Sequence, residues 1–124
     1  MITKSHKSVF AASIALVVIL ASSIPVPAQS SYSLRMENNT GYNIYQVRMS
    51  SVDDPSWERD LLGSRIFWDG TSFTITQITA GYYDMMFVDQ NDGVCVLHNV
   101  AIFSNLDWDL TRGWLLDCER RPAW

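Results

Sequence analysis

Positive charge is scarce in this chain and unevenly distributed. Both lysines lie in the first seven residues, and the rest of the chain has seven arginines against 13 acidic residues. The net charge beyond residue 28 is therefore near −6, whereas nucleic-acid-binding proteins present a basic patch or stripe. The sequence argues against a nucleic-acid partner, and the missing lysines exclude Schiff-base and Ser–Lys chemistry beyond residue 28.

Histidine is almost as scarce. His98 is the only histidine beyond residue 28, so acid–base chemistry that uses histidine has to use this one. No nucleophile motif such as G-x-S-x-G surrounds it. We therefore expect His98 to have a structural role.

Only two cysteines are present, Cys95 and Cys118. With His98 they are too few and too far apart in sequence for a structural zinc site. In an oxidising compartment an even number of cysteines indicates pairing. We expect a Cys95–Cys118 disulfide, and two buried free thiols are the alternative.

The chain also lacks a hydrophobic run long enough to span a bilayer. Residues 9–20 are uncharged, but a run of about 12 residues is shorter than the roughly 20 that a membrane span needs. With a basic start before it and the small residues Val26-Pro27-Ala28 after it, the run is typical of a secretory signal peptide. We expect cleavage after Ala28, a secreted or periplasmic mature protein, and no stable membrane anchor.

Residues 29–124 are enough for one small domain. Apolar and polar residues alternate along most of it, which predicts strands with one buried face. The predicted strands are 32–37, 42–50, 65–68, 72–78, 82–89, 94–100, 106–111 and 114–118. Seven to eight short strands separated by turn residues predict an all-β fold, a small antiparallel β-sandwich or a partly open barrel.

Two connections have more specific signatures. Residues 38–41, Asn-Asn-Thr-Gly, predict a turn that joins the first two strands in a hairpin. Residues 54–63 predict a short helix, with Asp54 as the N-cap, Pro55 at the first helical position and Gly63 as the stop. This helix would be a two-turn connection rather than part of the core.

Several turn and loop segments form a recognisable series. They are Asn38-Asn39-Thr40-Gly41-Tyr42, Trp57 to Gly63, Asp69-Gly70, Tyr83-Asp84 and Asp89 to Gly93. In this order they resemble the pattern of a family of small secreted bacterial β-domain proteins with no assigned activity, some of which carry an argininosuccinate lyase label. The resemblance covers roughly residues 32–111 and implies a compact secreted β domain. It implies no catalytic residues, because argininosuccinate lyase is a much larger helical protein.

The loop from Asp89 to Gly93 is a candidate binding site. Its pattern matches part of a calcium loop, but an EF-hand needs oxygen ligands where Gly93 and Val100 stand. A hairpin turn is the simpler interpretation. A looser Ca²⁺ site at Asp89 and Asp92 stays open, and no other cofactor is expected.

Two other acidic groups allow a ligand role. Asp107 and Asp109 lie on one strand face, about 7 Å apart by the strand rise, a spacing that suits a cation or a glycosidic bond. Their alternation with apolar neighbours predicts instead that both face water. The acidic loop with Asp53, Asp54 and Asp60 is a second possible looser Ca²⁺ site, although Asp54 is already explained as a helix cap.

Asp84 is a candidate for a different reason. It lies in a strand that is apolar on both faces, so we expect it to be partly buried. A buried carboxylate needs a partner or a raised pKa. Arg48 or Arg65 would supply a structural ion pair, and a ligand-binding role is the alternative.

Aromatic residues are abundant, with five tryptophans. Core packing accounts for most of them. We expect Trp68, beside the turn at Asp69-Gly70, and Trp124 to be exposed. Exposed aromatic side chains can stack on sugars or anchor a protein partner.

Two functions are compatible with these residues. The preferred one is a secreted or periplasmic, non-enzymatic module that binds a protein, glycan or envelope component through Trp68, Asp84, Asp89 and Asp92. The alternative is a small carboxylate-dependent hydrolase, with or without Ca²⁺. The hydrolase requires a concave site where at least two carboxylates converge, drawn from Asp84, Asp89, Asp107 and Asp109.

Overall fold

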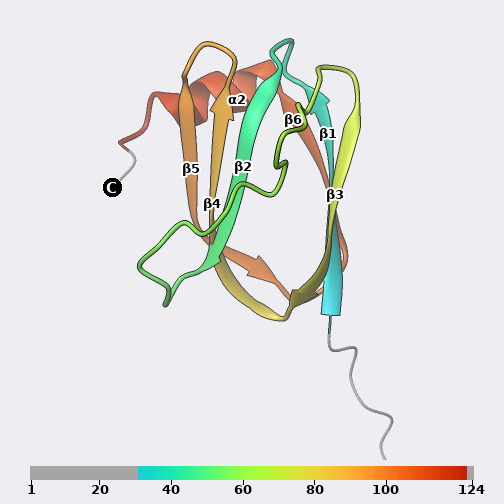
Figure 1. Ribbon diagram of the computed structural model, residues 1–124, viewed down its shortest axis with the longest axis vertical. Helices are drawn as coiled ribbons and strands as arrows, with labels where there is room; N and C mark the ends of the chain where they lie inside the picture. Colours follow the sequence, from blue (N-terminus) through green and yellow to red (C-terminus); the bar gives the residue numbers. More distant parts are fainter. Residues whose placement is uncertain (1–30, 123–124) are drawn as a thin grey trace, which may run out of the picture.

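The computed structural model describes residues 31–122, which form two β-sheets and one helix (Figure 1). The first sheet has the order β3 (Ser72–Thr79), β1 (Ser31–Asn39), β6 (Leu106–Thr111), and the second has the order β2 (Ile44–Ser51), β4 (Gly81–Asp89), β5 (Val94–Ile102). The helix α2 (Arg112–Glu119) follows β6 and contacts β5. The predicted signal peptide and Trp124 lie outside the described residues.

Six strands are therefore present between residues 31 and 122, rather than the seven or eight predicted, and the two sheets do not close into a barrel. Strand neighbours are antiparallel except β1 and β6, which are parallel. The Ser33 N–H donates to the Asn105 side chain at 3.0 Å, which fixes the start of β6 beside the start of β1. The first sheet is mixed for this reason, and the prediction of a purely antiparallel fold is wrong.

The predicted hairpin of the first two strands is also wrong, because β1 and β2 belong to different sheets. The Asn38 side chain is completely buried and donates to the carbonyls of Tyr42 and Phe67, at 2.9 and 3.0 Å. Its Oδ1 accepts from the Thr40 backbone and hydroxyl. These bonds turn the chain across the core instead of back along β1.

The β2–β3 loop, residues 52–71, does not contain the predicted helix at 54–63. Asp54 accepts from the Ser56 N–H in a local turn. Further along, Asp60 Oδ1 accepts from the Val47 N–H, and the Leu61 N–H donates to the Val47 carbonyl. A two-turn helix is marginal by itself, and here the loop is stabilised by bonding to the edge of β2.

Two predicted strands have other structures. Residues 65–68 contribute a single antiparallel bridge, Phe67 with Ile44. Residues 114–118 lie in α2, where Thr111 Oγ1 accepts from the Trp114 N–H as an N-cap. The helical period buries Leu115 and Cys118 together, which alternation along a strand would not do.

The core lies between the sheets and combines residues from both with the first half of α2. Its completely buried members include Leu34, Met36, Ile44, Val47, Met85, Phe87, Ile102 and Leu115. Across residues 31–122, no helix has both the length and the apolarity that a membrane-spanning segment requires.

The predicted Cys95–Cys118 disulfide is present, with the two Cα atoms 5.2 Å apart. It joins β5 to α2. Both cysteines are buried, so the bond also belongs to the core.

Candidate functional site

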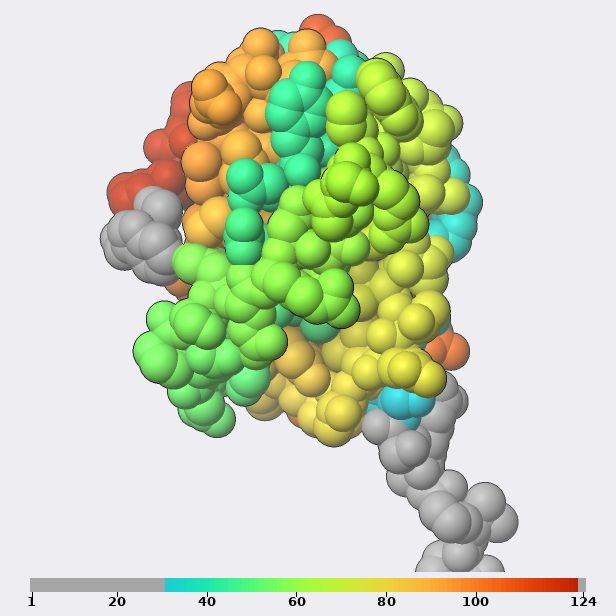
Figure 2. Space-filling model, in the orientation of Figure 1, coloured from blue at the N-terminus to red at the C-terminus, as the bar shows by residue number. Residues whose placement is uncertain are grey.

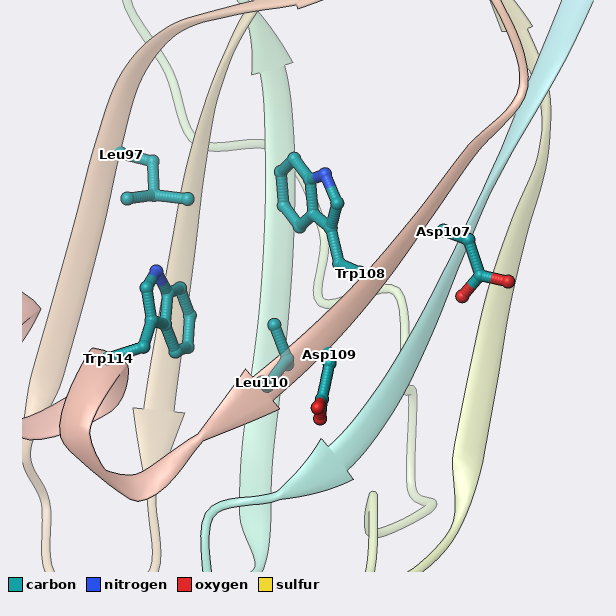
Figure 3. Close-up of a pocket in the computed structure, with 6 residues that line it drawn as sticks. All are labelled: Leu97, Asp107, Trp108, Asp109, Leu110 and Trp114. Atoms are coloured by element: carbon teal, nitrogen blue, oxygen red, sulfur yellow. The ribbon is translucent and has the colours of Figure 1, made fainter.

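A cleft of about 310 Å³ lies between β5 and β6, the strands at the edges of the two sheets. Its lining residues are Leu97, Asp107, Trp108, Asp109, Leu110 and Trp114. In Figure 3, Leu97, Trp108 and Trp114 point toward one another, whereas Asp107 points away from them. The side chains that point into the cleft are therefore apolar or aromatic, and its volume lies at the lower end of the range of small-ligand sites.

Three elements position the apolar lining. Trp108 and Leu110 alternate along β6 with residues of its outer face, and Leu110 is almost fully buried. Trp114 lies in the first turn of α2 and packs edge-on against Phe87, with ring centroids 5.6 Å apart. The two tryptophans are only partly buried, so their remaining surface is available to a ligand.

The carboxylates of Asp107 and Asp109 lie on the outer face of the first sheet. Arg35 Nη1 is 3.2 Å from Asp107 Oδ1, and Arg35 Nη2 is 3.1 Å from Glu37 Oε2. The hydrogen bonds that Arg35 donates to Glu37 and Asp107 raise its pKa. Asp109 accepts from Asn39 Nδ2 at 2.7 Å. Both aspartates border the cleft, but their charged groups already have partners outside it.

Asp84 lies on the outer face of the second sheet and is partly buried, as predicted. Its partner is not an arginine: Asp84 Oδ1 is 3.3 Å from His98 Nδ1 and accepts from the Asn99 N–H. On the other side of β4, Ser50 of β2 is the register partner of Asp84. Asp84 thus lies on the strand between those of Ser50 and His98, whereas a catalytic triad requires the histidine between the serine and the aspartate.

The predicted arginine partners have other roles. Arg48 donates to the Gln46 side chain at 3.0 Å. Arg65 lies over the ring of Phe73, with 5.3 Å between the guanidinium carbon and the ring centroid. Asp84 is paired with histidine because the hairpin turn at Asp89 to Gly93 makes β4 and β5 neighbours, and their register brings His98 beside Asp84.

The loop from Asp89 to Gly93 is the predicted hairpin turn between β4 and β5. Asp89 is 2% exposed, and its Oδ1 accepts from the N–H groups of Asn91 and Gly93. Asp92 occupies the left-handed region, with φ of 63°. The Asp89 carboxylate therefore holds the turn together.

Sequence reasoning missed Glu119, which packs against this turn. A side chain at Gly93 would place its Cβ 2.5 Å from Glu119 Oε1, so the Glu119 carboxylate would have to move to admit it. Glu119 Oε2 is buried and has no hydrogen-bond partner within the described residues. Burial and the neighbouring Asp89 carboxylate raise the pKa of Glu119 to about 7. The prediction of a strand at 114–118 gave no reason to expect this contact, because Glu119 reaches Gly93 from the end of a helix.

Trp68 is 54% exposed, as predicted. It lies in the β2–β3 loop, next to Phe67 on the edge of β2, and is not part of the β5/β6 cleft. Of the four ligand candidates, Asp89 and Asp92 share the β4–β5 turn, whereas Trp68 lies in the β2–β3 loop and Asp84 lies on the outer face of the second sheet. In residues 31–122, no group of three or more His, Cys, Asp or Glu side chains is arranged to hold a metal ion.

The residues that carry the family resemblance hydrogen-bond mainly to backbone groups that are close to them in space. Asn38 and Asp89 do so as described above. Asp60 Oδ1 also accepts from the Leu62 N–H, and Asp69 Oδ1 accepts from the Gly41 N–H. These residues therefore maintain turns, and membership of the family stays a prediction. Comparison of the chain with protein-family models, curated proteins and solved structures finds no match.

Proposed function

We propose that this protein is an exported, non-enzymatic binding module, a small β-sandwich that takes its ligand in the β5/β6 cleft. The observation that carries the proposal is the apolar cleft itself, where Leu97, Trp108 and Trp114 point toward one another (Figure 3). Partly exposed tryptophans supply large contact areas with little loss of side-chain entropy on binding. They suit a protein segment or a sugar ring better than an ion.

Export to the periplasm or the extracellular medium is consistent with two independent features. One is the predicted signal peptide. The other is the Cys95–Cys118 disulfide, since such bonds persist mainly in oxidising compartments.

Binding is favoured over hydrolysis because the carboxylates have structural partners. Asp107 pairs with Arg35, Asp84 contacts His98, and Asp89 accepts from its own turn. A general acid and base pair would need carboxylates directed into one concave site. Here they are distributed over two outer faces and one turn.

The proposal is tested by measuring binding to a random-octapeptide display library and to a panel of neutral and acidic oligosaccharides. A ligand from either class should shift the backbone resonances of Leu97 and Leu110 and the indole N–H resonances of Trp108 and Trp114. Trp108→Ala should weaken its binding at least tenfold, because the main aromatic contact is removed.

Trp68→Ala is the matched control, since Trp68 is also an exposed tryptophan but lies outside the cleft. It should leave the affinity within about twofold of the native value. Binding that depends on Trp68 and not on Trp108 would transfer the site to the β2–β3 loop. Turnover of an oligosaccharide by the native protein would contradict the non-enzymatic assignment.

A further inference from the structure

The direction of the β6 backbone identifies the class of ligand. We infer that the cleft receives an extended peptide, which adds a strand to the free edge of β6 and places one large apolar side chain between Leu97, Trp108 and Trp114. The inference rests on the proposed function, because it concerns the same cleft. Strand addition supplies affinity through backbone hydrogen bonds and specificity through pockets for alternate side chains.

Hydrogen bonds at both ends of β1 establish which of its residues face β6. The Asn38 N–H donates to the Thr71 carbonyl, and the Asn38 carbonyl accepts from the Gly70 N–H, both on the β3 side. The Ser33 N–H donates instead to Asn105, on the β6 side. Backbone groups alternate along a strand, so the odd-numbered residues of β1 bond to β6.

The same alternation then orients β6. Asp107 is the register partner of Arg35, and in a parallel pair a residue bonds to the two residues that flank its partner, here Leu106 and Trp108. The N–H and C=O groups of Asp107 and Asp109 consequently point to the open edge. Both residues line the cleft although their carboxylates lie outside it. Among residues 31–122 no backbone group bonds to them, so a peptide beside β6 would meet available donors and acceptors there.

The β5 edge is less suited to a new strand. The Cys95–Cys118 disulfide attaches α2 to it at one end. Further along, Asn99 has φ of 56°, and the pairing with β4 changes register between Tyr83 and Met85. In contrast, β6 keeps an unbroken register with β1 from Leu106 to Thr111.

The charge beside the cleft indicates the composition of the peptide. On the outer face the Arg35 guanidinium pairs with two carboxylates, those of Glu37 and Asp107, and a third, that of Asp109, accepts from the neutral Asn39 side chain. This excess of negative charge, in a domain whose net charge is near −6, complements lysine or arginine at the ends of the bound segment. We therefore expect an apolar residue flanked by basic ones.

Two substitutions at Asp109 separate backbone pairing from charge. Asp109→Pro removes an N–H that faces the open edge, so it blocks the added strand while the ladder to β1 stays intact. Asp109→Ala removes the same carboxylate but keeps the N–H. Peptides enriched from the octapeptide library should bind Asp109→Pro at least tenfold more weakly and Asp109→Ala within about threefold of the native protein.

Circular dichroism and thermal unfolding check that both variants are folded. If Asp109→Pro does not fold, methylation of single peptide amides replaces it: binding should fall at alternate positions only, because alternate amides face β6. Equal losses of peptide affinity in Asp109→Pro and Asp109→Ala would overturn strand addition. So would a methylated peptide series in which the loss of affinity does not alternate along the peptide.

The test also separates this inference from the proposed function. Suppose that an oligosaccharide binds the native protein, that Trp108→Ala abolishes this binding and that Asp109→Pro leaves it unchanged. This result would contradict the peptide ligand but would keep the cleft as the binding site. Failure of both probe classes to bind in a manner that depends on Trp108 would contradict both proposals.

Discussion

The edge strands on the two open sides of the molecule, β2 and β6, differ in whether another segment bonds to them. On one side, the β2–β3 loop completes β2: Phe67 exchanges two backbone hydrogen bonds of 2.9 Å with Ile44, and Val47 is bonded by Asp60 and Leu61. In Figure 2 this loop, in green, covers a wide surface beside β2. On the other side, no segment of residues 31–122 bonds in this way to β6.

An uncovered strand edge next to a cleft is a liability for a small domain, because it allows pairing with other chains. The β2 edge shows how a peptide segment satisfies such a strand, with backbone hydrogen bonds along the edge and apolar residues packed into the core. Leu62 and Phe67 are almost completely buried there. The β6 edge has the cleft and outward-facing backbone groups, but no segment of residues 31–122 pairs with it as the β2–β3 loop pairs with β2. This difference supports the proposal that a partner supplies the pairing segment.

The largest expected effect concerns the β5/β6 side. Replacing both Cys95 and Cys118 with serine should lower the free energy of unfolding by about 3 kcal/mol, because the bond closes a loop of 23 residues in the unfolded chain. Guanidinium unfolding measures the loss. Hydrogen exchange should show α2 opening first, since the bond attaches it to β5. A change below about 1 kcal/mol would mean that packing alone holds α2 in place.

A smaller effect is expected on the β2/β3 side. Asp60→Ala should lower stability by about 2 kcal/mol, because the Val47 and Leu62 N–H groups lose their acceptor. Asp53→Ala is the control: Asp53 is an exposed carboxylate of the same loop, and surface changes of this kind stay within about 0.5 kcal/mol. Equal effects would show that the loop does not depend on bonds to β2.

The smallest effect involves Glu119, whose pKa of about 7 lies above its ordinary value of 4.5. The folded state therefore binds the proton more tightly than the unfolded state. This contribution to stability is complete below pH 4.5, falls as the pH rises through about 7, and is absent above it. Allowing for solvent screening, the loss is of order 1 kcal/mol.

Glu119→Gln should remove this pH dependence and make the variant more stable than the native protein at pH 8. Unfolding curves at pH 5 and pH 8 measure the difference. Asp117→Asn, an exposed position on the same helix that pairs with Arg120, should not change the slope. A native protein whose stability stays constant from pH 5 to pH 8 would contradict the role of Glu119.

Local patterns in the sequence were sufficient for the features that depend on neighbouring residues. Alternation, an apolar run at 82–89 and the turn residues between them predicted the six strands that the structure contains, and the Asp89 to Gly93 turn follows from residues that bond to one another. Two cysteines in a chain with a predicted signal peptide can pair only with each other within one molecule. The exposure of Trp68 followed from its place beside a turn.

Tertiary structure decided the features that join distant segments. The predicted hairpin failed because Asn38 bonds to Phe67, 29 residues away. The predicted helix failed because Asp60 bonds to Val47. The cleft exists only because β5, β6 and α2 bring Leu97, Trp108 and Trp114 together. Periodicity reports which face of an element is apolar, whereas the element that covers that face is chosen by packing over the whole chain.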